Sequence, residues 1–156
     1  MAGFVVSNLN FFVSSSAVTP VFFVDNTLGT KTVRIKRLII VGTHNPLDGH
    51  LVTVRGNRTL GTLARHSELT ARGRYTDSSD QPNMYGCRFY EWDGTSSGMG
   101  GFSDGNLLFQ SHVVSAPANH GSGFILKAGD NLAVQVAGHS AGTTLAHLRC
   151  FGTVDQ

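Results

Sequence analysis

The sequence predicts an all-β protein folded as an antiparallel β-sandwich. Its apolar residues are gathered in short runs rich in Val, Ile and Phe, residue types that pack well on a pleated sheet. Nineteen glycines, many beside Asn, Asp or Ser, separate these runs with turn-forming sequence. Several runs alternate apolar and polar residues, and no helical segments lie between them to support parallel βαβ units.

The chain is predicted to form a single domain. It has 156 residues, of which 40% are apolar, enough for one compact core. We expect residues 19–156 to form the sandwich. Residues 1–18 contain the apolar but poorly patterned FVVSNLNFFV, which fits either an N-terminal arm that orders against a neighbouring molecule or an ordinary first edge strand.

Eight apolar runs are the predicted strands. In chain order they are PVFFV from Pro20, TVRIKRLIIV from Thr32, HLVTV from His50, CRFYEW from Cys87, LLFQSHVV from Leu107, FILK from Phe124, NLAVQV from Asn131 and TLAHLRCF from Thr144.

Three of these runs indicate which side chains share a face. In the run from Thr32 the apolar face is Val33, Ile35, Ile39 and Val41, and Arg37 interrupts it, which predicts a β-bulge. In the run from Leu107 the apolar face is Leu107, Phe109 and Val113, with Gln110 and His112 opposite. In the run from Asn131 it is Leu132, Val134 and Val136, with Asn131, Ala133 and Gln135 opposite.

Two segments give no clear strand pattern. Residues Arg58 to Arg74 are ambiguous, because Leu60, Leu63 and Leu69 suit a helix whereas Gly61 weakens one. The Gly- and Ser-rich stretch from Asp93 to Asn106 is predicted to be an exposed loop inside the one domain.

Charge and cysteine content narrow the function classes. The net charge is +2, too small a field to make nucleic acid or an anionic membrane the main partner. No stretch approaches the roughly 20 apolar residues that span a bilayer, and the first residues lack a basic segment and a long apolar region like those of a secretory signal.

Cys87 and Cys150 lie in apolar contexts without C-x-x-C spacing, so we expect buried free thiols in a chain made in a reducing cytosol, with one disulfide the lesser alternative.

The stretch Gly138-His139-Ser140-Ala141-Gly142 fits the G-x-S-x-G pattern of a nucleophile elbow. A serine nucleophile needs a histidine base oriented by an acid, and after Ser140 only His147 and Asp155 are available, in the reverse of the α/β-hydrolase order. The sequence instead favours a hairpin, with AGHSAG as a small-residue loop between two strands.

Two other groups of residues resemble a zinc site and a phosphate-binding loop only weakly. His44, Asp48 and His50 could bind zinc, but their spacing matches no common zinc pattern, and Asn45-Pro46 and Asp48-Gly49 suit an ordinary turn. The loop from Gly98 to Phe102 suggests a phosphate cradle, yet Ser103 stands where the fingerprint needs glycine. We therefore expect no metal and no nucleotide.

Aromatic and basic residues leave further alternatives open. Tyr90 and Trp92 share a face with Arg88, and we expect that face to be core, although an outward orientation would make it an interface or a sugar platform. Arg34, Lys36 and Arg37, with Arg72 and Arg74, form small basic patches that ordinarily are solvated or protect strand edges.

The segment from Phe124 to Val136, FILKAGDNLAVQV, has a strand, an AGD turn and a second strand. Gly129 supplies conformational freedom to the turn, and Asp130 can bond neighbouring amides. This pattern resembles the late strands of two groups of jelly-roll modules: the decoration, or cement, and accessory structural proteins of tailed-phage virions, and the C1q and tumour-necrosis-factor-like trimers. The resemblance implies a jelly-roll-like sandwich and transfers no functional residue.

The phage group is the closer resemblance. The run TVRIKRLIIVG from Thr32 to Gly42 is similar to an early strand of small phage structural proteins, whereas the closing TLAHLRCFGTVDQ does not match the aromatic-rich last strand of the C1q-like trimers. We therefore expect a non-enzymatic capsid decoration protein, made in the host cytoplasm and located on the capsid surface.

The expected partners are the major capsid protein or other virion proteins and further copies of the chain in a homotrimer. No cofactor is expected. The alternative is a glycan-binding module of a viral fibre that uses Tyr90 or Trp92, and the remote alternative is a serine esterase that uses Ser140.

Overall fold

The computed structural model describes residues 2–14, 18–42, 51–57, 67–69, 72–73, 84–91, 106–112, 118–119, 123–137 and 143–155. These residues form strands, turns and short connections. The strands are β1 (Ala2–Ser14), β2 (Val18–Asp25), β3 (Val33–Gly42), β4 (Leu51–Gly56), β5 (Ser67–Leu69), β6 (Arg72–Gly73), β7 (Arg88–Glu91), β8 (Asn106–His112), β9 (Ala118–Asn119), β10 (Phe124–Leu126), β11 (Asn131–Ala137) and β12 (Thr143–Val154). No helix in this part of the chain is long and apolar enough to cross a membrane.

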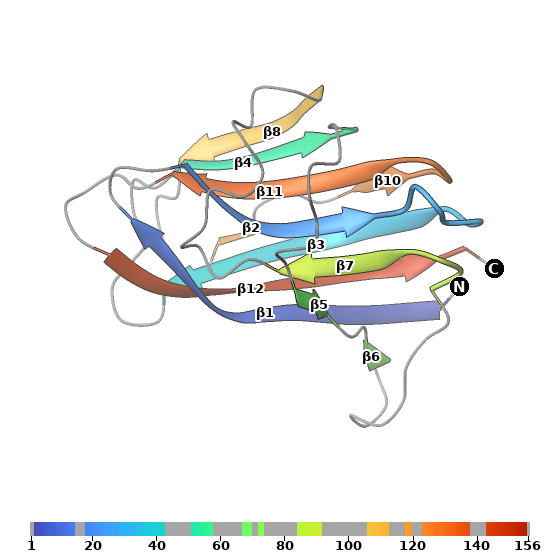
Figure 1. Cartoon of the computed structure of the whole chain (residues 1–156), viewed down its shortest axis with the longest axis horizontal. Helices are drawn as coiled ribbons and strands as arrows, with labels where there is room; N and C mark the ends of the chain where they lie inside the picture. Colours follow the sequence, from blue (N-terminus) through green and yellow to red (C-terminus); the bar gives the residue numbers. More distant parts are fainter. Residues whose placement is uncertain are drawn as a thin grey trace.

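The strands form two antiparallel sheets packed face to face (Figure 1). The first has the order β10-β3-β12-β1-β6, with β9 also paired to β3, and the second has the order β5-β7-β2-β11-β4-β8. The first four strands alternate between the sheets, as do β10, β11 and β12, which is the jelly-roll arrangement. The predicted all-β antiparallel sandwich is therefore confirmed, and each of the eight predicted runs contains a strand.

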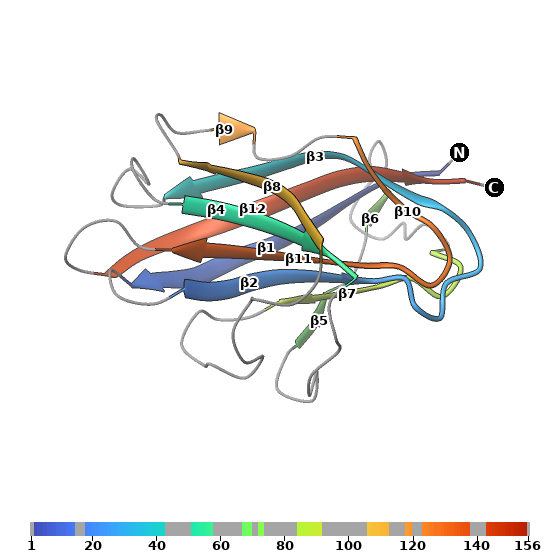
Figure 2. The ribbon, with the colours of Figure 1, turned by 90° about the horizontal axis from the view of Figure 1, so that it is seen from above.

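The N-terminal segment belongs to the sandwich. β1 pairs with β12 from Ala2 opposite Val154 to Ser14 opposite Thr143, so the ends of the chain lie together at one end of the molecule (Figure 2). Residues 2–14 of this segment are therefore a strand of the first sheet. Because β6 pairs with the outer side of β1 at only two residues, most of that side is a sheet edge within the described residues.

The core lies between the two sheets and is built from aliphatic and aromatic side chains of both. Phe4 of β1 contacts Phe89 of β7 across the sandwich, with ring centroids 5.2 Å apart. Phe22 of β2 stacks on the same Phe89 at 6.1 Å. Leu132, Val134 and Val136 face this core as predicted.

A β-bulge in β3 changes which of its residues face the core. Phe151 of β12 pairs with Arg37, and the next residue, Gly152, pairs with Ile35, so Lys36 is an extra residue in β3. The bulge predicted at this point is present. It shifts the alternation by one residue, so the buried side chains are Val33, Ile35, Leu38 and Ile40. The prediction that Ile39 shares the inward face was wrong, because the phase after a bulge is reversed.

The two strands flanking the Ser140 motif do not form the predicted hairpin. β11 pairs with β2 and β4, whereas β12 pairs with β1 and β3, so the chain passes from one sheet to the other between them. The residues predicted as an ambiguous helix, Arg58 to Arg74, include the short strands β5 and β6, and the remainder lies outside the described residues.

Candidate functional site: an apolar open edge

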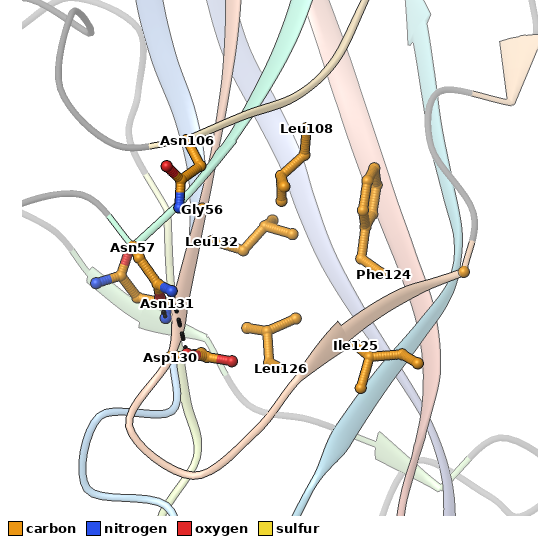
Figure 3. A pocket seen from close by; sticks show the side chains of 11 residues that line it. Gly56, Asn57, Asn106, Leu108, Phe124, Ile125, Leu126, Asp130, Asn131 and Leu132 are labelled. Atoms are coloured by element: carbon orange, nitrogen blue, oxygen red, sulfur yellow. Dashed lines mark hydrogen bonds between the residues drawn. The ribbon is translucent and has the colours of Figure 1, made fainter.

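A hollow of about 310 Å³ lies at the open side of the sandwich, between β8 at the edge of one sheet and β10 at the edge of the other. Its apolar lining comes from Leu108, Phe124, Ile125, Leu126 and Leu132, which are drawn around the hollow in Figure 3. Leu126 and Leu132 also belong to the core, so the hollow is a direct extension of the sandwich interior.

The polar rim of the hollow is held by hydrogen bonds within the chain. Asn57 has a positive φ of 53°, a conformation that asparagine tolerates, and its main-chain N–H donates to the Asn131 carbonyl oxygen at 2.9 Å. Its side-chain oxygen accepts from the Asn131 N–H at 3.0 Å, and its amide donates to the Asp130 carboxylate at 3.1 Å. These bonds tie the end of β4 to the start of β11.

The AGD turn fixes the position of Asp130 beside the hollow. Gly129 has a φ of 98°, where a side chain would be strained, and its N–H donates to the Asn26 carbonyl oxygen at 2.9 Å. The Asp130 carboxylate accepts from the Lys127 N–H at 2.9 Å, which closes the turn. Gly129 therefore provides the conformational freedom predicted for the turn, and Asp130 bonds a neighbouring amide as predicted.

Asn26 joins this turn to the β2–β3 turn. Its side chain is fully buried, and its amide donates to the carbonyl oxygens of Lys31, Leu126 and Lys127 at 3.0, 3.1 and 2.9 Å. Neither the charge pattern nor the strand pattern of the sequence singled out Asn26. An asparagine directly after a strand signals a turn, but two of its three partners, Leu126 and Lys127, lie about a hundred residues away and only the fold brings them together.

Leucines are exposed at this edge because β8 also contains a bulge. Val54 pairs with Phe109 and Arg55 with Leu107, which leaves Leu108 as the extra residue over the hollow. Leu107 and Leu108 are 52% and 47% exposed, while Phe109 packs partly against the core. The predicted shared face of Leu107 and Phe109 is therefore wrong, because the bulge separates their orientations.

We define the apolar edge as Leu107, Leu108 and Ile125. Ile125 of β10 is 53% exposed and is one of the residues that line the hollow (Figure 3). Of the four large apolar side chains that are exposed among the described residues, three form this edge, and Leu28 in the β2–β3 turn is the fourth. Such an edge can bury apolar groups of another molecule, and β8 and β10, which end their sheets among the described residues, can pair with an extended chain.

The partners proposed for Ser140 are not brought together. His147 and Asp155 lie on or directly after β12, about 26 Å apart for eight residues of extended chain. Asp155 instead accepts hydrogen bonds from Arg34 at 3.1 Å with both oxygens, and this contact lowers the pKa of its carboxyl. Ser140 lies outside the described residues, but the segment after it is the strand β12, whereas an elbow requires a helix there.

Other predicted site residues fall partly outside the described chain. His44, Asp48 and His50 and the loop from Gly98 to Phe102 lie there, as does Trp92. In the part that is described, no three His, Cys, Asp or Glu side chains come together to hold a metal ion.

Tyr90 does not lie in the core. It pairs with Phe23 on the face of its sheet opposite Phe89 and is partly exposed, so the core orientation expected for it was wrong. Arg88, two residues earlier on the same strand, makes a 4.0 Å ion pair with Glu68 of β5.

Cys87 and Cys150 are both buried free thiols. Burial, together with the nearby Asp25, raises the pKa of Cys87 to about 12. Burial also raises the pKa of Cys150, so both thiols stay protonated at neutral pH and are poor nucleophiles.

No protein-family model matches the chain, and neither a curated protein nor a solved structure resembles it closely enough to indicate a relationship.

Proposed function

We propose that the protein is a non-enzymatic structural protein of a virion: a decoration protein that forms a homotrimer and binds between subunits of a phage capsid. The observation that supports this proposal is the apolar edge, where Leu107, Leu108 and Ile125 are about half exposed beside a hollow open to the core. It would be made in the host cytoplasm and would act on the capsid surface.

The composition of the edge favours an interface over a free surface. Proteins commonly protect sheet edges with charged side chains, proline or short strands, because an unprotected edge recruits other chains. Here, β8 is seven residues long, and its bulge turns Leu108 over the hollow. Burying these side chains against another copy would remove apolar surface from water, which favours association.

A closed ring of three copies is the assembly that the resemblance to trimeric jelly-roll modules implies. In such a ring each copy presents its edge to a different surface of the next copy, so every edge is covered. A decoration protein gains further from being trimeric, because several weak capsid contacts act together and raise the overall affinity.

The first experiment measures the mass of the purified chain in solution by sedimentation equilibrium. We expect a trimer for the native chain and monomers for the double variant Leu108→Ser and Ile125→Ser. Leu28→Ser is the matched control, since Leu28 is 80% exposed but lies outside the edge, and it should remain trimeric. A monomeric native chain, or a trimer unaffected by the edge variant, would contradict the proposed assembly.

The second experiment tests the capsid role. Native protein and the edge variant are mixed with phage particles stripped of accessory proteins, and occupancy is measured by cryo-electron microscopy. We expect the native chain to occupy ordered positions and the monomeric variant to lose occupancy, because it lacks the multivalent contribution. Absence of native protein from every particle tested would reject the capsid role without bearing on self-association.

A glycan-binding module of a viral fibre is the second candidate. The outward position of Tyr90, beside the Arg88–Glu68 ion pair, favours it, since partly exposed aromatic side chains can stack on sugars. Binding on a glycan array that is lost in Tyr90→Ala or Trp92→Ala would favour this candidate. The esterase alternative is checked separately by assaying a generic ester with the native chain and with Ser140→Ala.

A further inference from the structure

The outer face of the β10-β3-β12-β1 sheet carries an uneven distribution of charge. We define the basic face as Lys36, Arg37 and Arg149 together with the apolar Val5, Ile39 and Phe151. The three cations are exposed, whereas the three apolar side chains are partly buried. This face points away from the core, because the alternate residues of β3 and β12, such as Leu38 and Cys150, are the buried ones.

The β3 bulge creates this face. Lys36 is the extra residue, and both Lys36 and Arg37 are exposed where a regular strand would turn one of two successive side chains inward. Arg37 lies opposite Phe151, which in turn lies opposite Val5. One row of the sheet therefore presents a cation, an aromatic ring and an aliphatic side chain, each about 5 Å from the next.

The neighbouring row places a second cation beside an aliphatic side chain. Arg149 lies opposite Ile39 on one side and Ser7 on the other. Arg149 and Arg37 are diagonal neighbours on adjacent strands, about 7–8 Å apart. The two residues therefore place two positive charges on the same part of this face.

Acidic groups on the described part of this face do not balance the cations. Asp155 is the carboxylate there, and it makes a 3.1 Å ion pair with Arg34. Its pKa is lowered mainly by the Arg34 hydrogen bond, and the charge of Lys36 also contributes. Four cations on or beside the face thus share one carboxylate, and within the described residues neither Arg37 nor Arg149 has an acidic partner.

We infer that the basic face binds an acidic surface of a partner protein that also carries apolar side chains. Arginine and aromatic residues are enriched in protein interfaces, and here they alternate on a flat sheet. A carboxylate-bearing partner would balance the positive charges of Arg37 and Arg149, while its apolar groups would pack beside Val5 and Ile39.

Nucleic acid and membrane fit the face less well. Proteins that bind duplex DNA commonly neutralise about 6–10 phosphates, more than the cations on or beside this face, and polybasic membrane-binding segments have about 4–8 Lys or Arg, a range of which this face reaches only the lower limit. A phosphate backbone would also offer no apolar groups to pack against Val5 and Ile39. The inference does not rest on the proposed function, because the residues of the basic face are distinct from Leu107, Leu108 and Ile125, although Ile125 lies beside Arg34 on the same sheet.

The test uses the full-length chain and fluorescent peptides, with binding followed by anisotropy. The probe is an acidic peptide in which Glu and Asp alternate with Leu and Phe, and the comparison peptide has Ser in place of the apolar residues. A short DNA duplex and phosphatidylserine vesicles are the competing probes.

Three variants make the result specific. Arg37→Glu with Arg149→Glu reverses the basic face, and Arg37→Gln with Arg149→Gln removes the charges with less disturbance of the fold. Arg88→Glu with Lys127→Glu is the matched control, since both residues are exposed, lie outside the face and give the same change in net charge as the reversal. Leu108→Ser, in the apolar edge, separates this test from self-association.

We expect saturable binding of the acidic apolar peptide, weaker binding of the Ser peptide, and at least about a tenfold loss of affinity in the charge-reversed face. The Gln variant should lose part of that affinity, and the control and Leu108→Ser variants should stay within about twofold of native. Equal loss in the matched control, stronger binding of DNA or vesicles, or no saturable binding would each overturn the inference.

Discussion

Replacing Asn26, a small buried polar residue, should lower the free energy of unfolding strongly. Its amide satisfies three main-chain carbonyls, and the side chain has no exposed surface. Replacing it with alanine would leave these carbonyl oxygens, one in a buried and two in part-buried hydrogen bonds, without this donor, and an uncompensated buried group costs about 1–3 kcal/mol. We therefore expect Asn26→Ala to lower the free energy of unfolding by about 3 kcal/mol or more, as measured by urea denaturation.

Asn57 is the matched control for this prediction. Its side chain also forms hydrogen bonds with Asp130 and Asn131, at the start of β11, but Asn57 is exposed, so water can replace these partners. Asn57→Ala should cost about 1 kcal/mol. Similar losses for the two variants would contradict the role assigned to the buried amide.

The two thiols predict how stability depends on alkaline pH. Cys87 titrates at about 12 in the folded chain against a usual value of 9.0, and the pKa of Cys150 is raised in the same direction. Above pH 9 the unfolded chain releases thiol protons that the folded chain keeps, so the free energy of unfolding falls as pH rises. The slope is up to about 1.4 kcal/mol per pH unit for each thiol, and the contribution is fully present below pH 9.

The measurement compares urea denaturation on either side of pH 9 in the native chain and in Cys87→Ala with Cys150→Ala. The double variant should be less stable at every pH because it leaves cavities, but its stability should fall less steeply with pH. Parallel pH dependence in the two proteins would show that the thiols already ionise normally in the fold.

At the scale of elements, β1 is part of the structural core. Phe4 and Val6 are buried, and β1 pairs with β12 along almost its whole length. Deleting residues 1–14 should therefore prevent folding, with loss of the cooperative urea transition, because it removes two core side chains and opens the edge of β12. A deletion variant that keeps a cooperative transition would instead indicate a dispensable arm, for which capsid attachment would be the next measurement.

Strand positions followed from the sequence better than strand faces did. Runs of Val, Ile and Phe bounded by Gly, Asn and Asp located eight strands, since both signals are local. The faces of β3 and β8 failed at bulges, where one extra residue reverses every later side chain. Arg37 in an apolar face signalled the first bulge, whereas Leu107-Leu108 gave no signal, because both leucines looked like core.

The site was harder to predict than the fold. The AGD turn was visible in the sequence, and the reasons for Gly129 and Asp130 were correct because they depend on neighbouring residues. The hollow, in contrast, is lined by Leu108 of β8 together with residues of β10 and β11, which lie farther along the chain. Asn26 likewise hydrogen-bonds to Leu126, 100 residues away in the sequence. Contacts of that kind depend on which strands become edges, and a linear pattern does not encode them locally.

At the scale of the whole molecule, the connection between β11 and β12 decides how the chain closes. A small-residue loop between two apolar strands predicts a hairpin on local grounds, yet each strand joins a different sheet. The consequence is that β12 lies beside β1 while β11 lies beside β2 and β4, which places both termini at one end and leaves β8 and β10 as edges (Figure 2).

The apolar edge predicts how the melting temperature depends on protein concentration. If copies associate through Leu107, Leu108 and Ile125, association binds only the folded state and stabilises it by mass action. The melting temperature of the native chain should then rise with protein concentration, by a few degrees for each additional 1 kcal/mol or so of linkage. The variant Leu108→Ser with Ile125→Ser should melt at a temperature independent of concentration. Because both replaced side chains are partly exposed, the variant should lose little intrinsic stability. Differential scanning calorimetry over a wide concentration range distinguishes the two, with Leu28→Ser behaving as native; a concentration-independent native melting temperature would mean that the edge stays open to solvent in the isolated protein.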